Sequence, residues 1–160
     1  NILMFEQIST FFTIEMIYLW ANIGVIPVWF ILIFFPNSNI CKFFALSIFP
    51  ILVFSCLYVF LIYYFFVNNY EFINNFKLYL GLETLKSLFS EESFLMLFWI
   101  HFLALNLFCG AYIVKDSRKF MISKYLTFLP LTTTYFVGPL GILIYWVIRI
   151  FFSKNINLIE

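Results

Sequence analysis

Long apolar runs, separated by short polar turns, dominate the chain. Four of them reach the roughly 20 residues that a helix needs to cross the hydrocarbon core of a bilayer. They cover about residues 13–35, 43–67, 94–114 and 125–152. No second domain or internal repeat is visible. The pattern predicts an all-α fold, in which a four-transmembrane-helix bundle forms a single integral membrane domain over residues 1–160.

The connection between the second and third runs has an amphipathic pattern instead. Over about residues 71–90, apolar side chains recur at helical spacing, with charged residues between them. This arrangement predicts an interfacial amphipathic helix between helices 2 and 3. An ordinary solvated loop helix is the alternative interpretation. Ser90 and the two glutamates after it are typical of the start of the third membrane helix.

Composition indicates that lipid is the solvent for these helices. Hydrophobic residues make up 64% of the chain and charged residues only 11%, whereas a soluble domain carries about a quarter charged residues. The net charge is +1 and no basic stripe is present, which argues against nucleic-acid binding. Cys41, Cys56 and Cys109 lack the spacing of a metal site or disulfide framework. They are interpreted as small core residues.

The basic residues give only a small orientation signal. With four spans, five basic residues fall in the short turns and four on the side of the long connection. The excess favours short turns that face the cytosol-equivalent compartment. The chain opens with Asn1 rather than Met. We therefore expect a preceding segment, for which a removed targeting sequence and simple disorder both stay open.

The fourth apolar run contains several residues that disturb helices. Pro130 and Pro139 each remove a backbone donor, as Pro27 and Pro50 do in the first two runs. Residues 132–134 are three threonines, whose hydroxyls can bond back to carbonyls. Residues 138–141 read Gly-Pro-Leu-Gly. A kinked, tightly packed helix and a helix that lines a ligand cavity are the two interpretations.

Few ionisable groups lie at membrane depth, where such groups are costly and are functional candidates by default. Glu15 and Arg149 lie near helix ends, where Glu15 reaches the interface and Arg149 can snorkel. His101, the only histidine, lies well inside the third span. At 100° per residue, His101 and Asn106 point roughly 140° apart, so any partner of His101 must come from another helix. A neutral imidazole bonded to that helix, a proton-transfer group and an axial ligand of a pigment metal all stay open.

Several motifs, in their order along the chain, resemble one family. They are WANIGVIP at residues 20–27, LFS at 88–90, WIHFL at 99–103, VKDSR at 114–118 and GPLG at 138–141. Together they resemble the abscisic-acid-deficient, or neoxanthin-synthesis, family of small integral membrane proteins. The resemblance implies a plastid membrane and a role in converting violaxanthin to neoxanthin. Helix 2 contributes only hydrophobicity to it.

The chain departs from the family pattern in its third helix. The resemblance implies an aspartate where this chain has Asn106 and an arginine where it has Ala111. Both changes remove a charged side chain from the third helix. If the family uses that pair for carotenoid isomerisation, this chain has lost it, and if the pair is only a structural ion pair, losing both members costs little. No serine–histidine–aspartate set, metal-ligand cluster or phosphate-binding glycine loop is found in the sequence. The sequence therefore predicts neither catalytic nor metal-binding residues.

Two hypotheses follow from the motifs and the departures. The first is a non-catalytic accessory or scaffold subunit of a larger membrane complex, plausibly a pigment-containing photosynthetic assembly. The second is a carotenoid isomerase that uses His101. The candidates for binding pigment or ligand are His101, Trp99, Asn106 and Asn22. Carotenoid or chlorophyll is the candidate cofactor, and lipid and other membrane subunits are the expected partners. A plastid thylakoid or envelope is the expected location, with the mitochondrial inner membrane as the alternative.

Overall fold

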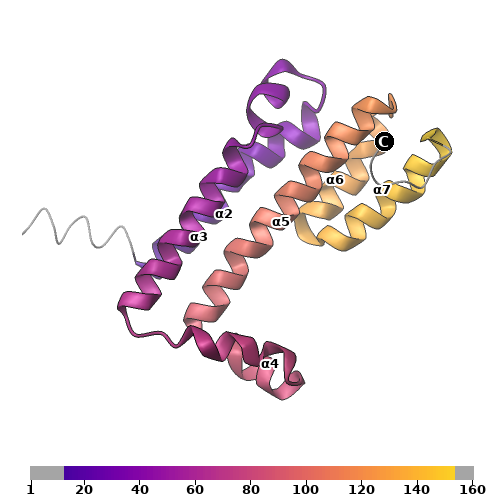
Figure 1. Ribbon diagram of the computed structural model, residues 1–160. Coiled ribbons are helices and arrows are strands. Elements are labelled where there is room, and N and C mark those ends of the chain that lie inside the picture. Colours follow the sequence, from indigo (N-terminus) through magenta and orange to yellow (C-terminus); the bar gives the residue numbers. More distant parts are fainter. Residues whose placement is uncertain (1–12, 154–160) are drawn as a thin grey trace, which may run out of the picture. The chain divides into compact units, whose positions relative to one another are not determined.

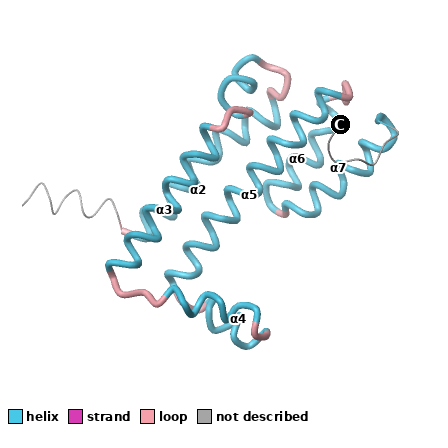
Figure 2. Tube along the Cα trace, viewed as in Figure 1, coloured by secondary structure: helices cyan, strands magenta, loops and turns pink. Residues whose placement is uncertain are grey.

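The computed structural model describes residues 13–153, and every regular element in this range is a helix (Figure 2). The all-α prediction is therefore confirmed. The described residues form two compact units, one of residues 13–24 and 53–102 and one of residues 25–52 and 103–153. Each unit is described by itself.

Among residues 13–153, three helical segments are long and apolar enough to cross a membrane, and their course is drawn in Figure 1. The first, α2, covers Ile14–Phe34. The second begins with a π-helical turn, η1 (Cys41–Ala45), and continues as α3 (Phe49–Val67). The third, α5, covers Glu92–Lys119. These segments confirm three of the four predicted spans, and α5 extends beyond its predicted bounds at both ends.

Pro50 lies just after a break in the second predicted span, because residues 46–48, between η1 and α3, are not helical. It is the second residue of α3, where the backbone N–H has no intrahelical acceptor to lose. The helix can therefore begin at Phe49 without a missing hydrogen bond at Pro50.

The prediction of one amphipathic helix over residues 71–90 is wrong in its form. The segment contains a 3₁₀-helix, η2 (Phe72–Tyr79), and a short α-helix, α4 (Leu82–Phe89). Between them Gly81 has a φ of 136°, a conformation that residues with a Cβ rarely adopt, so the chain reverses there instead of continuing the helix. The hydroxyl of Ser90 donates to the carbonyl of Lys86, and therefore closes α4 rather than capping α5.

The prediction of one continuous fourth span is also wrong. Residues 124–153 form two helices, α6 (Lys124–Phe136) and α7 (Gly138–Ser153), which pack as a helical hairpin (Figure 1). At about 1.5 Å per residue, they are roughly 20 Å and 24 Å long, whereas the hydrocarbon core is about 30 Å thick. Neither helix alone is long enough to cross it.

The break falls at Val137, which has a φ of −140° and a ψ of 86°. Pro139 explains its position, because the ring would clash with the carbonyl of Tyr135 in a continuous helix. The hydroxyls of residues 132–134 donate to carbonyls four residues earlier, among them that of Pro130. The predicted back-bonding of the threonines is therefore confirmed.

Contacts within the second unit show that α7 returns to the end from which α6 departs. Asp116, in the last turns of α5, lies 2.6 Å from Nε of Arg149 in the last turns of α7. Arg118 donates to the carbonyls of Pro36 and Ser38, so the turn after α2 lies at this end too. In one straight helix of residues 125–152, Arg149 would lie about 36 Å from the start, at 1.5 Å per residue.

This arrangement strengthens the orientation signal of the sequence. Six basic residues now lie at the end of the second unit where α5 and α7 finish, and these are Lys42, Lys115, Arg118, Lys119, Lys124 and Arg149. The η2–α4 segment carries two, Lys77 and Lys86. Lys154 lies outside the described residues. We therefore expect the end of α5 to face the cytosol-equivalent compartment.

The return of the hairpin can be tested by labelling cysteines from one side of the membrane. In a background without Cys41, Cys56 and Cys109, we expect Met121→Cys and Ser153→Cys to react with an impermeant maleimide from the same side. Tyr79→Cys should react only from the opposite side, because α5 separates it from Met121. Labelling of Ser153→Cys together with Tyr79→Cys would show a continuous fourth span and overturn the hairpin.

The close packing of α6 on α7 gives a second test. A Cβ at Gly141 would lie 2.6 Å from the Cα of Thr134, so Gly141→Ala must push the two helices apart. We expect a loss of about 1–3 kcal/mol in the free energy of unfolding, measured by denaturant titration in detergent micelles. Gly24→Ala is the control, since no atom lies within 4 Å of its added Cβ. An equal effect of both substitutions would contradict this account.

Candidate functional site

His101 lies on an exposed face of α5 in the first unit. Its ring centroid is 6.4 Å from that of Tyr58 on α3. Within residues 13–153 no group forms a hydrogen bond with the imidazole. The interpretation of His101 as a group bonded to a neighbouring helix therefore has no support among these residues.

Trp99 lies one turn from the start of the predicted membrane span, beside Tyr18 of α2. Their ring centroids are 5.7 Å apart, and both rings line a groove of about 470 Å³ between the first turns of α2 and α5. The walls are mostly apolar, and the carboxylates of Glu15 and Glu92 also line the groove. Nε1 of Trp99 is buried and has no acceptor among the described residues.

Asn22 satisfies its side chain within its own helix. Its Nδ2 donates to the carbonyl of Tyr18, one turn earlier, at 2.7 Å. It is not among the residues that line the groove. The structure gives Asn22 a local role in α2 and does not bring it to the groove that Trp99 lines.

Asn106 lies in the second unit and is buried, with 5% of its surface exposed. Its Nδ2 is 3.5 Å from the carbonyl of Tyr135, which is the carbonyl that Pro139 deprives of a helical donor. A Cβ at Gly138 would collide with Oδ1 of Asn106. The amide therefore packs into the break between α6 and α7, and glycine at position 138 makes room for it.

The strongest polar cluster in the described part of the chain was not among the residues predicted from the sequence. Oδ2 of Asp116 accepts from the hydroxyl of Tyr145 and from Nε of Arg149, each at 2.6 Å. The guanidinium of Arg149 lies between the rings of Phe120 and Trp146, at 4.5 Å and 4.4 Å from their centroids. The prediction that Arg149 snorkels is wrong, because only 1% of the residue is exposed.

Two sequence features could have identified this cluster. Asp116 lies in one of the family-like motifs, and Arg149 is the single cation in an otherwise apolar run. A buried arginine needs a counter-charge, so an acid near a helix end was the expected partner. The missing information was the hairpin, without which the two residues could not meet.

Arg118 has a structural role at the same end of the second unit. Its guanidinium donates to the carbonyls of Pro36 and Ser38, just after α2 ends at Phe34. These two carbonyls belong to the turn after α2, and a cation near the last turn of a helix also complements the helix dipole. The motif at residues 114–118 thus provides one residue that holds α7 and one that holds the turn after α2.

The four candidates from the sequence therefore do not form a single site. His101, Trp99 and Asn22 belong to the first unit, while Asn106 belongs to the second. Trp99 lines a groove, whereas His101 faces outward near Tyr58. Asn106 and Asn22 have hydrogen-bond partners in the protein and Nε1 of Trp99 is buried. The imidazole of His101 is therefore the polar group among the four that is exposed to an external partner.

Comparison with known proteins gives one match. The sequence model of the family described as ABA DEFICIENT 4-like matches residues 16–145. No curated protein and no solved structure matches the chain. The matched range includes α2, α5 and α6, and it ends at Tyr145, within the buried cluster.

The buried ion pair predicts a large, partner-dependent effect on stability. Asp116→Ala leaves the guanidinium of Arg149 without its carboxylate, and we expect a loss of about 3–5 kcal/mol in the free energy of unfolding. The double variant Asp116→Leu with Arg149→Met should lose less than Asp116→Ala alone, because no unpaired charge remains. Denaturant titration in micelles measures both.

The exposed pair of Glu83 and Lys86 is the matched control for this experiment. These side chains are 3.4 Å apart and mostly exposed, so Glu83→Ala should change the stability by less than about 1 kcal/mol. A double variant as unstable as Asp116→Ala would show that packing, and not the unpaired charge, causes the loss.

Proposed function

The chain belongs to the ABA DEFICIENT 4-like family, which is involved in neoxanthin synthesis, and from this premise we propose a non-catalytic role. The protein is an accessory or scaffold subunit of a larger, pigment-containing membrane complex, and it descends from a neoxanthin-synthesis protein. Its location is a plastid membrane, thylakoid or envelope. The mitochondrial inner membrane is the alternative location. Purification of the protein from native plastid and mitochondrial membranes decides between the two.

The observation that carries this proposal is the exposed imidazole of His101. It lies nine residues after Glu92, about 14 Å into a helix with a rise of 1.5 Å per residue, on a helix that can span the membrane. Hydrocarbon offers no hydrogen-bond partner, so an imidazole facing lipid at this depth loses its solvation without compensation. A partner subunit or a pigment that covers His101 supplies that compensation.

The unit that carries His101 also exposes side chains that suit such a partner. Its exposed large aromatic side chains include Tyr63, Phe66 and Phe98. Flat rings pack well against one another and against long conjugated molecules. A neutral imidazole can donate a hydrogen bond or coordinate the metal of a pigment. Carotenoid and chlorophyll are therefore the pigment classes that fit this unit.

The buried cluster supports a second candidate function, a carotenoid isomerase. Converting an epoxide to an allenic alcohol adds a proton to the epoxide oxygen and removes one from a chain carbon, so it needs an acid and a base. The hydroxyl of Tyr145 donates to Oδ2 of Asp116 at 2.6 Å, a distance within the reach of proton transfer between an acid and a base. In this structure, however, Oδ2 of Asp116 accepts from both Tyr145 and Arg149, which links α5 to α7.

His101 provides the test between these functions. We expect the tagged full chain, purified from its native membranes, to carry stoichiometric partner subunits or pigment. His101→Ala should weaken that association by about tenfold or more, the effect of one strong polar contact in a dry site. Leu105→Ala is the matched control, because Leu105 is exposed one turn further along α5.

The same preparations, supplied with violaxanthin, decide whether the protein is an enzyme. Allenic product that disappears in Tyr145→Phe, from a protein that purifies without partners, would replace the accessory role with the isomerase. Equal loss of partners in His101→Ala and Leu105→Ala would remove the imidazole from the proposal.

A further inference from the structure

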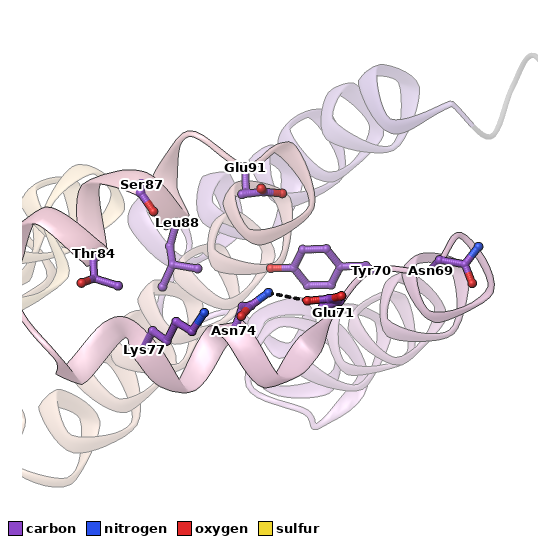
Figure 3. Close-up of a pocket in the computed structure, with 9 residues that line it drawn as sticks. All are labelled: Asn69, Tyr70, Glu71, Asn74, Lys77, Thr84, Ser87, Leu88 and Glu91. Carbon is purple, nitrogen blue, oxygen red and sulfur yellow. Dashed lines mark hydrogen bonds between the residues drawn. The ribbon is translucent and has the colours of Figure 1, made fainter.

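A polar pocket of about 450 Å³ lies between η2 and α4 in the first unit (Figure 3). Its volume is in the range of roughly 300–1,000 Å³ that small-molecule sites occupy. The pocket is separate from His101 and from the groove that Trp99 lines. The proposed accessory function makes no use of it.

The position of the pocket along the chain places it where membrane spans end. Asn69 lies two residues after the end of α3, and Glu91 directly precedes the first residue of α5. Both line the pocket. Beside it, Ile73, Phe76 and Leu80 are 70–75% exposed. Apolar side chains exposed at the ends of spans enter the lipid, so the pocket lies at the depth of the lipid headgroups.

The lining offers many hydrogen-bond donors and acceptors, and its net charge is small. Five neutral polar residues contribute, namely Asn69, Tyr70, Asn74, Thr84 and Ser87, with the two carboxylates of Glu71 and Glu91 and the one ammonium of Lys77. Lys77 and Thr84 lie at one end of the pocket, and Tyr70, Glu71 and Glu91 lie at the other (Figure 3). Donors and acceptors therefore occur along the whole pocket.

Several of these side chains are held in place before any ligand binds. The hydroxyl of Tyr70 is 2.6 Å from Oδ1 of Asn75, and Nδ2 of Asn74 donates to Glu71 at 3.0 Å. Burial and the nearby charge of Glu91 raise the pKa of Tyr70, so its phenol stays neutral. The ring of Tyr70 packs edge-to-face with that of Phe72, with centroids 4.9 Å apart.

We propose that this pocket binds the neutral sugar headgroup of a glycolipid. Sugar hydroxyls both donate and accept, so they match carboxylates and amide oxygens on one side and an ammonium, amide nitrogens and hydroxyls on the other. The ring of Tyr70 offers an apolar face to the sugar. The acyl chains extend along the exposed apolar side chains of η2.

The charges of the pocket disfavour other headgroups. Two carboxylates against one ammonium repel an anionic headgroup, and a single lysine provides no bidentate site for a phosphate. A zwitterionic headgroup would leave most of the neutral amides and hydroxyls without partners, which costs binding free energy. These headgroups are the comparison ligands of the test.

The experiment uses the full chain in detergent and measures bound lipid by native mass spectrometry. The probes are a monohexosyl diacylglycerol, the same diacylglycerol without sugar, phosphatidylethanolamine and phosphatidylglycerol. We expect the monohexosyl lipid to bind at least about tenfold more tightly than any of the others, since several hydrogen bonds distinguish it. A free methyl hexoside should compete only weakly, because it lacks the apolar chains.

Two variants and one control locate the site. Glu91→Ala removes a carboxylate acceptor and Thr84→Val removes one hydroxyl at nearly constant shape. We expect Glu91→Ala to weaken binding of the monohexosyl lipid by about tenfold or more, and Thr84→Val to weaken it by about threefold. Glu83→Ala should leave binding unchanged, since Glu83 lies on the same helix but pairs with Lys86 outside the pocket.

Four results would overturn the proposal. Equal affinity for the diacylglycerol without sugar would show that only the chains bind. Equal or tighter binding of phosphatidylethanolamine or phosphatidylglycerol would show a charged headgroup, and equal affinity for the free hexoside would show a soluble sugar. Equal weakening by Glu83→Ala and Glu91→Ala would place the lipid elsewhere.

Discussion

The pairing of Asp116 with Arg149 is the interaction on which the second unit depends. An arginine at the end of an apolar helix can extend to water or find a counter-charge inside the protein. Here it lies between two aromatic rings and donates to a carboxylate that also accepts from Tyr145. This pairing requires the last turns of α7 to lie against the last turns of α5, and the break at Val137 makes that return possible.

Polar groups within the described residues fall into two kinds. Asp116, Asn106 and Arg118 find their partners inside the second unit, where they hold a helix break, a helix end and a hairpin together. His101 and the lining of the η2–α4 pocket offer groups to the outside of the first unit. The second unit thus has polar residues that are explained by folding. The first has polar residues that call for a pigment, a partner or a lipid.

How much could be predicted from sequence depended on the kind of signal. Hydropathy over some 20 residues located α2, α3 and α5, because crossing a membrane sets a minimum length that few other structures need. The same hydropathy signal predicted α6 and α7 as one continuous span. Gly138 and Pro139 interrupt the helix over only two residues, which hardly changes a mean hydropathy over about 20 residues. Helical periodicity placed η2 and α4 in one helix, because the spacing of apolar residues carries no information on the positive φ of Gly81.

Site residues were harder to predict because burial depends on long-range contacts. The sequence identified His101 as costly at membrane depth, but it could not show that the imidazole lies on an exposed face of α5. It could not identify Asp116 and Arg149 as a pair. Their distance along the chain is large, and only the hairpin brings them together. A charge near a predicted helix end is equally compatible with the interface and with a buried pair.

The departure at Asn106 has a physical explanation in the helix break. The carbonyl of Tyr135 has lost its helical donor to Pro139, and Nδ2 of Asn106 is the group that faces it. An ionised aspartate at this position could not donate, and two oxygens would face each other in a dry site. An amide therefore supports the break where a carboxylate would require a further cation. Asn106 thus stabilises the break between α6 and α7 without a buried charge.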